Sequence, residues 1–225
     1  MDFMEQDLFG VSVERLLLAG AQTVYMLGWS MLFGAILGIA IALLLVMTRR
    51  GGLIENRVVY SVLNFIINVT RSVPFIILLV ALIPFTRFVV GTSIGSQAAL
   101  VPLTIYITPF IARMVESSLL EVKPGVIEAA QAMGATNWQI IRHFLLPEAY
   151  PSIVLSLTTS IVGLLGATAM AGYGGGGGVG DLALTYGHQR FNTPLMIFTI
   201  VILVVFVQIM QAFGNSLSRR LREPK

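Results

Sequence analysis

Five consecutive glycines form the segment of this sequence that most suggests chemistry: Gly174, Gly175, Gly176, Gly177 and Gly178. Glycine-rich loops cradle phosphate groups when a lysine and a hydroxyl residue follow the last glycine. Here Gly180 is followed by Asp181 and Leu182, so the sequence does not predict a nucleotide site. Two interpretations stay open. The tract is a flexible linker, or its bare backbone lies close to a neighbouring helix or to a partner docked on the outer face, where it could also move as an outer gate.

The sequence predicts neither a metal site nor thiol chemistry. His143 and His188 are far apart and have no Cys or Glu partner at the spacing of metal ligands. Cysteine is absent, so no disulfide framework is available.

A polar segment, residues 123–147, separates two apolar runs and offers a shaped surface to another molecule. Pro124 suits the first turn of a helix, where its missing N–H would be unpaired anyway. Glu128 then lies near the positive end of that helix. Gly134 ends the helix, because glycine accepts the left-handed conformation of a helix terminus.

A second short helix should follow Gly134. Thr136 and Gln139 have the spacing of a capping box, which starts a helix that runs until Pro147 opens the next apolar run. Apolar residues recur at helical spacing through both helices and give one face for docking: Val126, Ile127, Ala130, Met133, Trp138, Ile141 and Leu145.

The composition is that of a polytopic membrane protein. Of the 225 residues, 56% are apolar and 11% are charged, and the mean hydropathy is +0.86. Soluble domains carry about 25% charged residues. We therefore expect a single all-α transmembrane domain over residues 1–225. Asp2, Glu5 and Asp7 stand where a secretory signal would be basic, so we expect the first span to be retained.

Five apolar runs are long enough to cross a hydrocarbon core of about 30 Å: 18–47, 58–85, 98–115, 151–172 and 193–217. Pro102 and Pro109 in the third run are tolerable only where neighbouring helices satisfy the freed carbonyls. Arg71 and Pro74 interrupt the second run, which is either one kinked span or a half-embedded helix followed by a short one.

Basic residues favour one side of this five-span arrangement. Arg15, Arg87 and Arg190 lie on one side, and Arg71 is left aside as the only charge well inside a predicted span. Ten lie on the other side, in the first loop, the third loop and the tail: Arg49, Arg50, Arg57, Arg113, Lys123, Arg142, Arg219, Arg220, Arg222 and Lys225. Cytoplasmic loops carry the excess of Lys and Arg. The bias therefore predicts the amino terminus outside, and the tail and the segment 123–147 in the cytoplasm.

The segment 123–147 resembles the EAA signature of the permease subunits of ABC importers. Glu128, Ala129 and Ala130 are followed by three residues, Gly134, eleven residues, and then Leu146 and Pro147. Phe144 stands where the family usually has isoleucine, which conserves hydrophobicity. The run 174–191 and the stretch 71–74 also resemble the methionine importer permeases of bacteria, so the likeness extends over nearly the whole chain.

The resemblance implies the fold of a type I ABC importer permease, working as a homodimer with the pathway at its two-fold axis. It implies that segment 123–147 of each copy is a coupling helix, which lies in a groove of a cytoplasmic ATPase subunit. The two copies would bind two such subunits, which carry ATP and Mg. The chain itself would bind no cofactor and would be no enzyme. An external or periplasmic solute-binding lipoprotein would deliver methionine, D- or L-, to the permease in the lipid of the bacterial inner membrane. No nucleic-acid partner is expected.

Four residues are candidates for the pathway or its gate: Arg71, Pro74, Met170 and Tyr173. Arg71 either snorkels to the cytoplasmic headgroups or lines a water-filled vestibule, and Pro74 would supply a hinge. Met170 is either a packing residue or a soft, adaptable plug.

Small residues recur every four positions in two of the apolar runs. In lipid such ladders give close helix contacts, and lining of a translocation path is the alternative. The ladders are Ser30, Gly34, Gly38 and Ala42 in the first run, and Ser152, Ser156 and Ser160 in the fourth.

Other functions remain as alternatives. The same mechanism could carry another amino acid or a small organic anion. An ion-driven secondary transporter normally needs an ionisable or carbonyl-rich site at the membrane midplane. The acidic residues, Glu116 included, all fall in loops, tails or span ends, so that class has no positive support. A scaffold without transport activity would not need the broken helix and prolines of residues 71–109.

Overall fold

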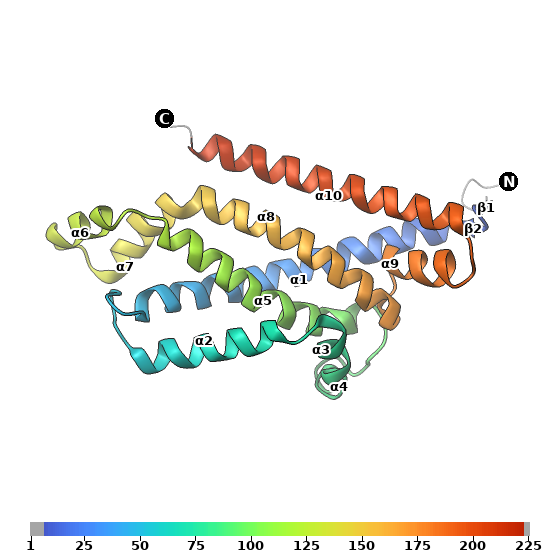
Figure 1. Cartoon of the computed structure of the whole chain (residues 1–225), viewed down its shortest axis with the longest axis horizontal. Helices are drawn as coiled ribbons and strands as arrows, with labels where there is room; N and C mark the ends of the chain where they lie inside the picture. The colour runs from blue at the N-terminus through green and yellow to red at the C-terminus, as the bar shows by residue number, and fades with distance from the viewer. Residues whose placement is uncertain (1–6, 223–225) are drawn as a thin grey trace. The chain divides into compact units, whose positions relative to one another are not determined.

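The computed structural model describes residues 7–222, and nearly all of these are helical (Figure 1). Asp2 and Glu5, on which the prediction of a retained first span rests, and Lys225, one of the ten basic residues assigned to the cytoplasmic side, lie outside the described residues. The described part of the chain begins with a two-stranded antiparallel hairpin, β1 (Asp7–Leu8) and β2 (Val11–Ser12). Three segments of π-helix interrupt or extend the α-helices. The helical segments follow the hairpin in this order: α1 (Val13–Thr48), α2 (Arg57–Ser72), α3 (Phe75–Ala81), α4 (Ile83–Val90), α5 (Ser96–Leu120), α6 (Pro124–Ala132), α7 (Asn137–Ile140), η2 (Ile141–Leu145), α8 (Leu146–Ala171), η3 (Gly172–Gly176), α9 (Val179–Asp181), η4 (Leu182–His188) and α10 (Thr193–Arg222).

The chain divides into two compact units by its internal contacts. Unit 1 comprises Met1–Phe33, Val73–Ile107 and Ile161–Ile209. Unit 2 comprises Gly34–Ser72, Thr108–Ser160 and Met210–Lys225. Each of the four long helices contributes one segment to each unit.

The all-α membrane fold predicted from the composition is confirmed. In the described part of the chain, four helical stretches are long and apolar enough to cross a membrane: Val13–Thr48, Ser96–Leu120, Asn137–Gly176 and Thr193–Leu221. A fifth span exists if α2 and α3 are counted together, although they bend by 103° at the break. The bend follows from Pro74, because a proline disfavours helical backbone in the residue before it.

Helix α5 runs past the predicted end of its span, and this corrects the placement of two charges. Arg113, predicted in a loop, lies inside α5, and Glu116 is 4% exposed one turn before the helix ends. The helix continues because the charges are paired: Arg113 Nη1 donates to Glu116 Oε2 at 2.7 Å. Arg113 Nη2 donates to the side-chain oxygens of Asn64 (2.7 Å) and Asn68 (3.1 Å) on α2.

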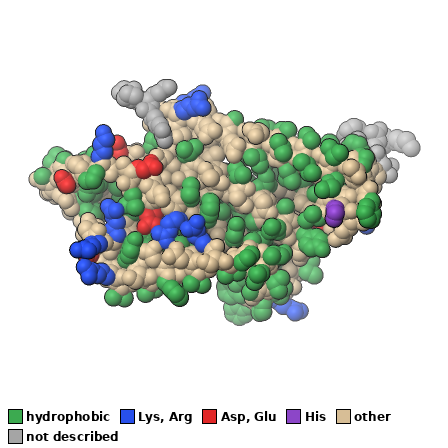
Figure 2. Space-filling model, viewed as in Figure 1, with side chains coloured by type: hydrophobic (Ala, Val, Ile, Leu, Met, Phe, Trp, Pro, Cys, Tyr) green, Lys and Arg blue, Asp and Glu red, His purple; other side chains and the backbone are tan. Residues whose placement is uncertain are grey.

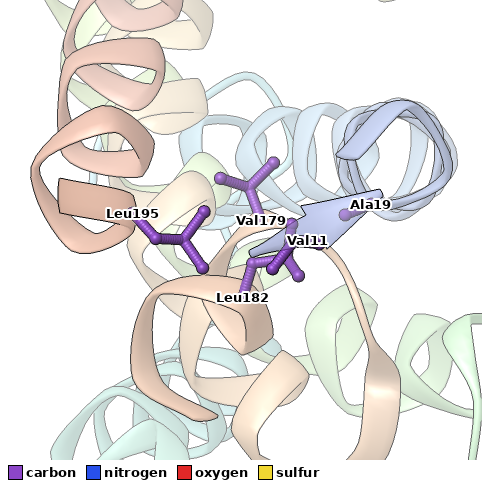
Figure 3. Close-up of a cluster of buried hydrophobic side chains, with 5 residues drawn as sticks. All are labelled: Val11, Ala19, Val179, Leu182 and Leu195. Atoms are coloured by element: carbon purple, nitrogen blue, oxygen red, sulfur yellow. The ribbon is translucent and has the colours of Figure 1, made fainter. Parts of the chain in front are cut away.

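The core of unit 1 joins the hairpin to four helical segments (Figure 3). Its buried side chains come from β2, α1, α9, η4 and α10, and Leu16, Tyr186 and Leu203 pack around them. These buried residues are Val11, Ala19, Val179, Leu182 and Leu195.

A second core holds α2 in unit 2. Leu45 of α1, Ile67 of α2 and Ala112 of α5 form it, with Ile41, Tyr60 and Leu63 packed against them. Apart from Ile67, α2 exposes many apolar side chains. Figure 2 shows Lys and Arg gathered over the loop that joins α1 to α2.

The small-residue ladders make close helix contacts, as predicted. In unit 2, a Cβ on Gly38 would lie 2.7 Å from Ile111 Cγ2 and 3.0 Å from the carbonyl oxygen of Thr108 on α5. The Ser156 hydroxyl lies 2.8 Å from that of Ser118, and Ser152 donates to Glu121 Oε2 at 2.8 Å. Close backbone approach and hydroxyl bonds are the two means by which helices associate in lipid.

Replacing Gly38 by alanine should destabilise the protein. The added methyl group meets α5, and overpacking of this kind costs about 1–3 kcal/mol. Gly28→Ala is the matched control on the same helix, because nothing lies within 4 Å of its Cβ position. We expect a lower midpoint of thermal unfolding in detergent for Gly38→Ala only. Equal midpoints for the two variants would show that the close contact between α1 and α5 at Gly38 does not contribute to stability.

Candidate functional site

The first half of the EAA segment folds as its residues predict. Pro124 is the first residue of α6, after the cap Lys123. The helix ends at Ala132, with Met133 as its cap, and Gly134 follows with φ +76°. Nothing lies within 4 Å of a Cβ placed on Gly134, so the glycine is needed for its backbone conformation.

The predicted capping box starts the second helix. The backbone N–H of Thr136 donates to Gln139 Oε1 at 2.8 Å, and the N–H of Gln139 donates to Thr136 Oγ1 at 3.4 Å. These reciprocal bonds fix how the chain enters α7. The two short helices and the break between them are therefore confirmed.

The prediction that the second helix ends at Pro147 was wrong. The chain is helical from Asn137 to Ala171, and it passes through a π-helical turn, η2, at Ile141–Leu145. There Leu146 N donates to the carbonyl of Ile141, five residues back. Proline normally breaks a helix by clashing with the preceding turn and by lacking an N–H. The widened turn just before Pro147 makes room for the ring, so the helix continues into α8.

The predicted apolar face divides into a packed part and an exposed part. Ala130, Ile141 and Leu145 are buried, as is Ile140, which was not assigned to the face. Met133 and Trp138 are 70% and 65% exposed, and Glu128 is exposed. The packed residues therefore hold the segment on unit 2, while the methionine, the tryptophan and the carboxylate remain available to another molecule.

A cavity of about 260 Å³ lies beside α6 in unit 2. Its charged and amide lining comes from Arg49, Glu128 and Gln131, and its apolar lining includes Leu53 and Leu145. The signature glutamate thus faces a hollow that is bounded by the loop after α1.

The glycine tract is bonded to its surroundings, which favours the interpretation of close backbone approach over that of a flexible linker. Gly178 N donates to Gln22 Oε1 (2.8 Å) and Val179 N donates to Thr23 Oγ1 (2.9 Å), both on α1. Ser96 Oγ donates to the carbonyl of Gly176 at 2.8 Å. A Cβ on Gly178 would lie 2.7 Å from Thr23 Oγ1, so a side chain would be excluded there.

The candidate pathway residues do not all come together. Pro74, Met170 and Tyr173 belong to unit 1, where Tyr173 lines a cavity of about 260 Å³ with residues of α3, α4, α5 and the glycine tract. Met170 and Tyr173 are exposed. Arg71 belongs to unit 2, and its guanidinium lies 5.9 Å from the ring centre of Phe110.

Asp181, beside the tract, accepts a hydrogen bond from Thr185 Oγ1 at 2.7 Å. Over residues 7–222, no group of three or more His, Cys, Asp or Glu side chains could hold a metal ion.

Comparison with known proteins finds a family and close relatives that match nearly the whole chain. Residues 34–223 match the family described as binding-protein-dependent transport system inner membrane component. The chain is 49% identical over 213 residues to the probable D-methionine transport system permease protein MetI of Vibrio cholerae, covering 95% of each. It is 46% identical over 203 residues to the protein of the same description from Pasteurella multocida, covering 90% of this chain and 94% of that one.

A solved structure has the same fold. A chain of the MetNI methionine ABC transporter, in an inward-facing conformation, superposes with a TM-score of 0.91 at 45% identity. The match covers 95% of this chain and all of that one.

Replacing Thr23 by valine should loosen the glycine tract. The buried N–H of Val179 would lose its acceptor, which costs about 1–3 kcal/mol. Thr199→Val is the control, because the Thr199 hydroxyl is buried but bonds only to carbonyls of its own helix. We expect faster amide hydrogen exchange over residues 176–179 in Thr23→Val alone. Unchanged exchange there would mean that α1 does not hold the tract.

Proposed function

We propose a function from the premise that this chain belongs to the family of inner membrane components of binding-protein-dependent transport systems. The chain is the permease subunit of an ATP-driven ABC importer for methionine, D- or L-. It forms the translocation pathway and couples it to a cytoplasmic ATPase. The observation that carries the proposal is the likeness to methionine permeases over 95% of the chain, together with the signature helix and its exposed residues.

The coupling role rests on the geometry of α6 and α7. The chain holds the segment by the capping box and by Ala130, Ile140, Ile141 and Leu145, and it leaves Met133 and Trp138 exposed. Large exposed apolar side chains on a rigid helix are typical of docking surfaces, where aromatic residues supply most of the binding energy. Their partner is a cytoplasmic ATPase subunit that carries ATP and Mg, since this chain has no nucleotide-binding loop.

The distribution of charge supports the proposed orientation. Unit 1 contains three basic residues, Arg15, Arg87 and Arg190, and unit 2 contains the other eleven. The excess of Lys and Arg marks the cytoplasmic side. We therefore assign unit 2, with the EAA segment and the carboxyl terminus, to the cytoplasmic side of the inner membrane. Unit 1, with the amino terminus and the glycine tract, takes the outer side.

The assembly follows from counting coupling segments. One chain carries one EAA segment, so two ATPase subunits need two such segments, from two copies of the chain or from a paired relative. We propose two copies, with the pathway on their two-fold axis. A solute-binding lipoprotein delivers the substrate to unit 1. In unit 1, the exposed Met170 and Tyr173 form the outer gate together with the hydrogen-bonded glycine tract. Pro74 supplies a hinge, and Arg71 lines the inner vestibule.

Changing the signature residues of the EAA segment should abolish transport without preventing membrane insertion. Glu128→Lys reverses the exposed carboxylate of the signature. Gly134→Val forces a β-branched residue into the left-handed region, which costs on the order of 1–3 kcal/mol. The measurement is methionine uptake, driven by ATP, in vesicles that contain the chain, its ATPase and its binding protein. We expect both variants to lose uptake and to bind less of the ATPase subunit.

Two matched variants serve as controls for coupling. Glu148→Lys reverses an exposed carboxylate outside the signature, and Gly125→Val adds a side chain where nothing lies within 4 Å. Both should transport normally. Normal uptake by Glu128→Lys and Gly134→Val would exclude the segment from coupling. If uptake by the wild-type protein needed an ion gradient and not ATP, the ABC mechanism itself would be excluded.

Cysteine labelling tests the orientation without background, because the chain has no cysteine. Gln189 in unit 1 and Asn137 in unit 2 are both exposed. In intact cells an impermeant thiol reagent should label Gln189→Cys, and it should label Asn137→Cys only after the membrane is opened. Labelling of Asn137→Cys from outside would invert the topology.

A further inference from the structure

We propose that a surface cluster in unit 1, formed by Arg15, Tyr186 and Arg190 with Phe191 directly after Arg190 in the sequence, binds the phosphate of an anionic phospholipid. We refer to these four residues as the arginine–tyrosine patch. They come from the first turn of α1, from η4, and from the turn before α10. The proposed transport function does not use them.

Two positive charges meet at one aromatic ring. The guanidinium carbons of Arg15 and Arg190 lie 5.0 Å and 4.3 Å from the centre of the Tyr186 ring. The two carbons are therefore within about 9 Å of each other, the sum of those two distances. The ring attracts each guanidinium, but the two cations repel each other at this separation.

Neither arginine is neutralised within the part of the chain that the structure describes. The ion pairs found over that range are Arg57 with Glu55 and Arg113 with Glu116. The side chains of Arg15 and Arg190 are exposed, as is Glu14, the acidic neighbour of Arg15 in the sequence. An anion that reaches the patch would therefore gain from two unpaired guanidiniums. Phosphate suits them, because its oxygens match the planar donor fork of arginine.

Phe191 gives an independent sign of function. Its backbone has φ +56°, a left-handed conformation that is uncommon for any residue other than glycine, and its side chain is 90% exposed. The turn is fixed: Phe191 N donates to the carbonyl of His188 at 3.1 Å, and Asn192 N donates to that of Gly187 at 2.8 Å. An exposed aromatic side chain held in a strained backbone indicates a binding role, because packing does not explain it.

The surroundings of the patch favour a lipid over a soluble partner. Leu17 and Leu18, directly after Arg15 in α1, are each 58% exposed, and Ile197 and Val201 are exposed on α10. These side chains begin apolar surfaces on two predicted membrane spans. Arginine and aromatic residues at the end of such a surface are typical of the membrane–water interface, where the headgroups lie.

The affinity of the purified full-length chain for phosphatidylglycerol and for phosphatidylcholine, measured by native mass spectrometry, tests this site. One basic side chain near an anionic membrane surface is worth about fivefold in affinity, and two are worth roughly 30-fold. We expect the double variant Arg15→Gln, Arg190→Gln to bind phosphatidylglycerol about 30-fold more weakly. The loss for phosphatidylcholine should be much smaller, because the arginines repel its choline cation and offset their attraction for its phosphate. Arg87→Gln is the control, because it removes the same charge from unit 1 at an exposed site where the structure shows no ring beside the arginine.

Three results would overturn the proposal. The first is an undiminished affinity of the double variant for phosphatidylglycerol. The second is an equal loss in Arg87→Gln, which would show a general charge effect. The third is an unchanged lipid affinity with reduced stimulation of ATP hydrolysis by a solute-binding protein, which would make the patch a protein-docking surface. None of these results depends on methionine being the substrate, so the proposed function is tested separately.

Phe191→Gly gives a test in which stability and binding should change in opposite directions. Glycine accepts the left-handed conformation, so the variant should unfold at a higher temperature in detergent. It should also lose preference for phosphatidylglycerol, because the aromatic anchor is gone. Phe191→Ala should lose the same preference without the gain in stability. Retained lipid preference in both variants would exclude Phe191 from the site.

Discussion

The need of each buried backbone group for a hydrogen-bond partner governs where this chain departs from regular helix. In an apolar environment an unpaired N–H or C=O costs several kcal/mol, so irregular backbone occurs only where other groups pair it. Gln22 and Thr23 supply acceptors for the end of the glycine tract, and Ser96 supplies a donor for its middle. The tract can leave the helix because side chains of α1 and α5 form hydrogen bonds with its backbone. Its glycines, which lack side chains, let those groups approach.

The same constraint explains the EAA segment, residues 123–147. Proline, glycine and a capping box give α6 and α7 defined ends without help from distant residues. The π-helical turn before Pro147 then lets the segment continue into α8 without a break. In the proposed coupling role, a displacement of α7 by a docked ATPase would therefore be passed directly to a membrane-spanning helix. A flexible joint at Pro147 would absorb it.

Charged groups within the fold follow a related rule. Arg113 and Glu116 remain inside a membrane-spanning helix because they pair with each other and with two asparagines of α2. The arginines beside Tyr186 have no such carboxylate among the described residues, and they lie at a surface. A buried charge is thus satisfied within the chain, whereas an exposed pair of like charges points to a ligand outside it.

The sequence alone determined the features that depend on neighbours along the chain: four of the membrane spans, the ends of α6, the capping box and the family signature. These follow from local hydrophobicity, backbone preference and short spacing, which need no knowledge of the fold. It could not show that α5 extends through Arg113 to Leu120, because the asparagines that satisfy this arginine are more than forty residues away. It also left open whether the glycine tract is a linker. Only the tertiary structure decided these points, since the partners of Arg113 and of Gly178 come from helices that folding alone brings near.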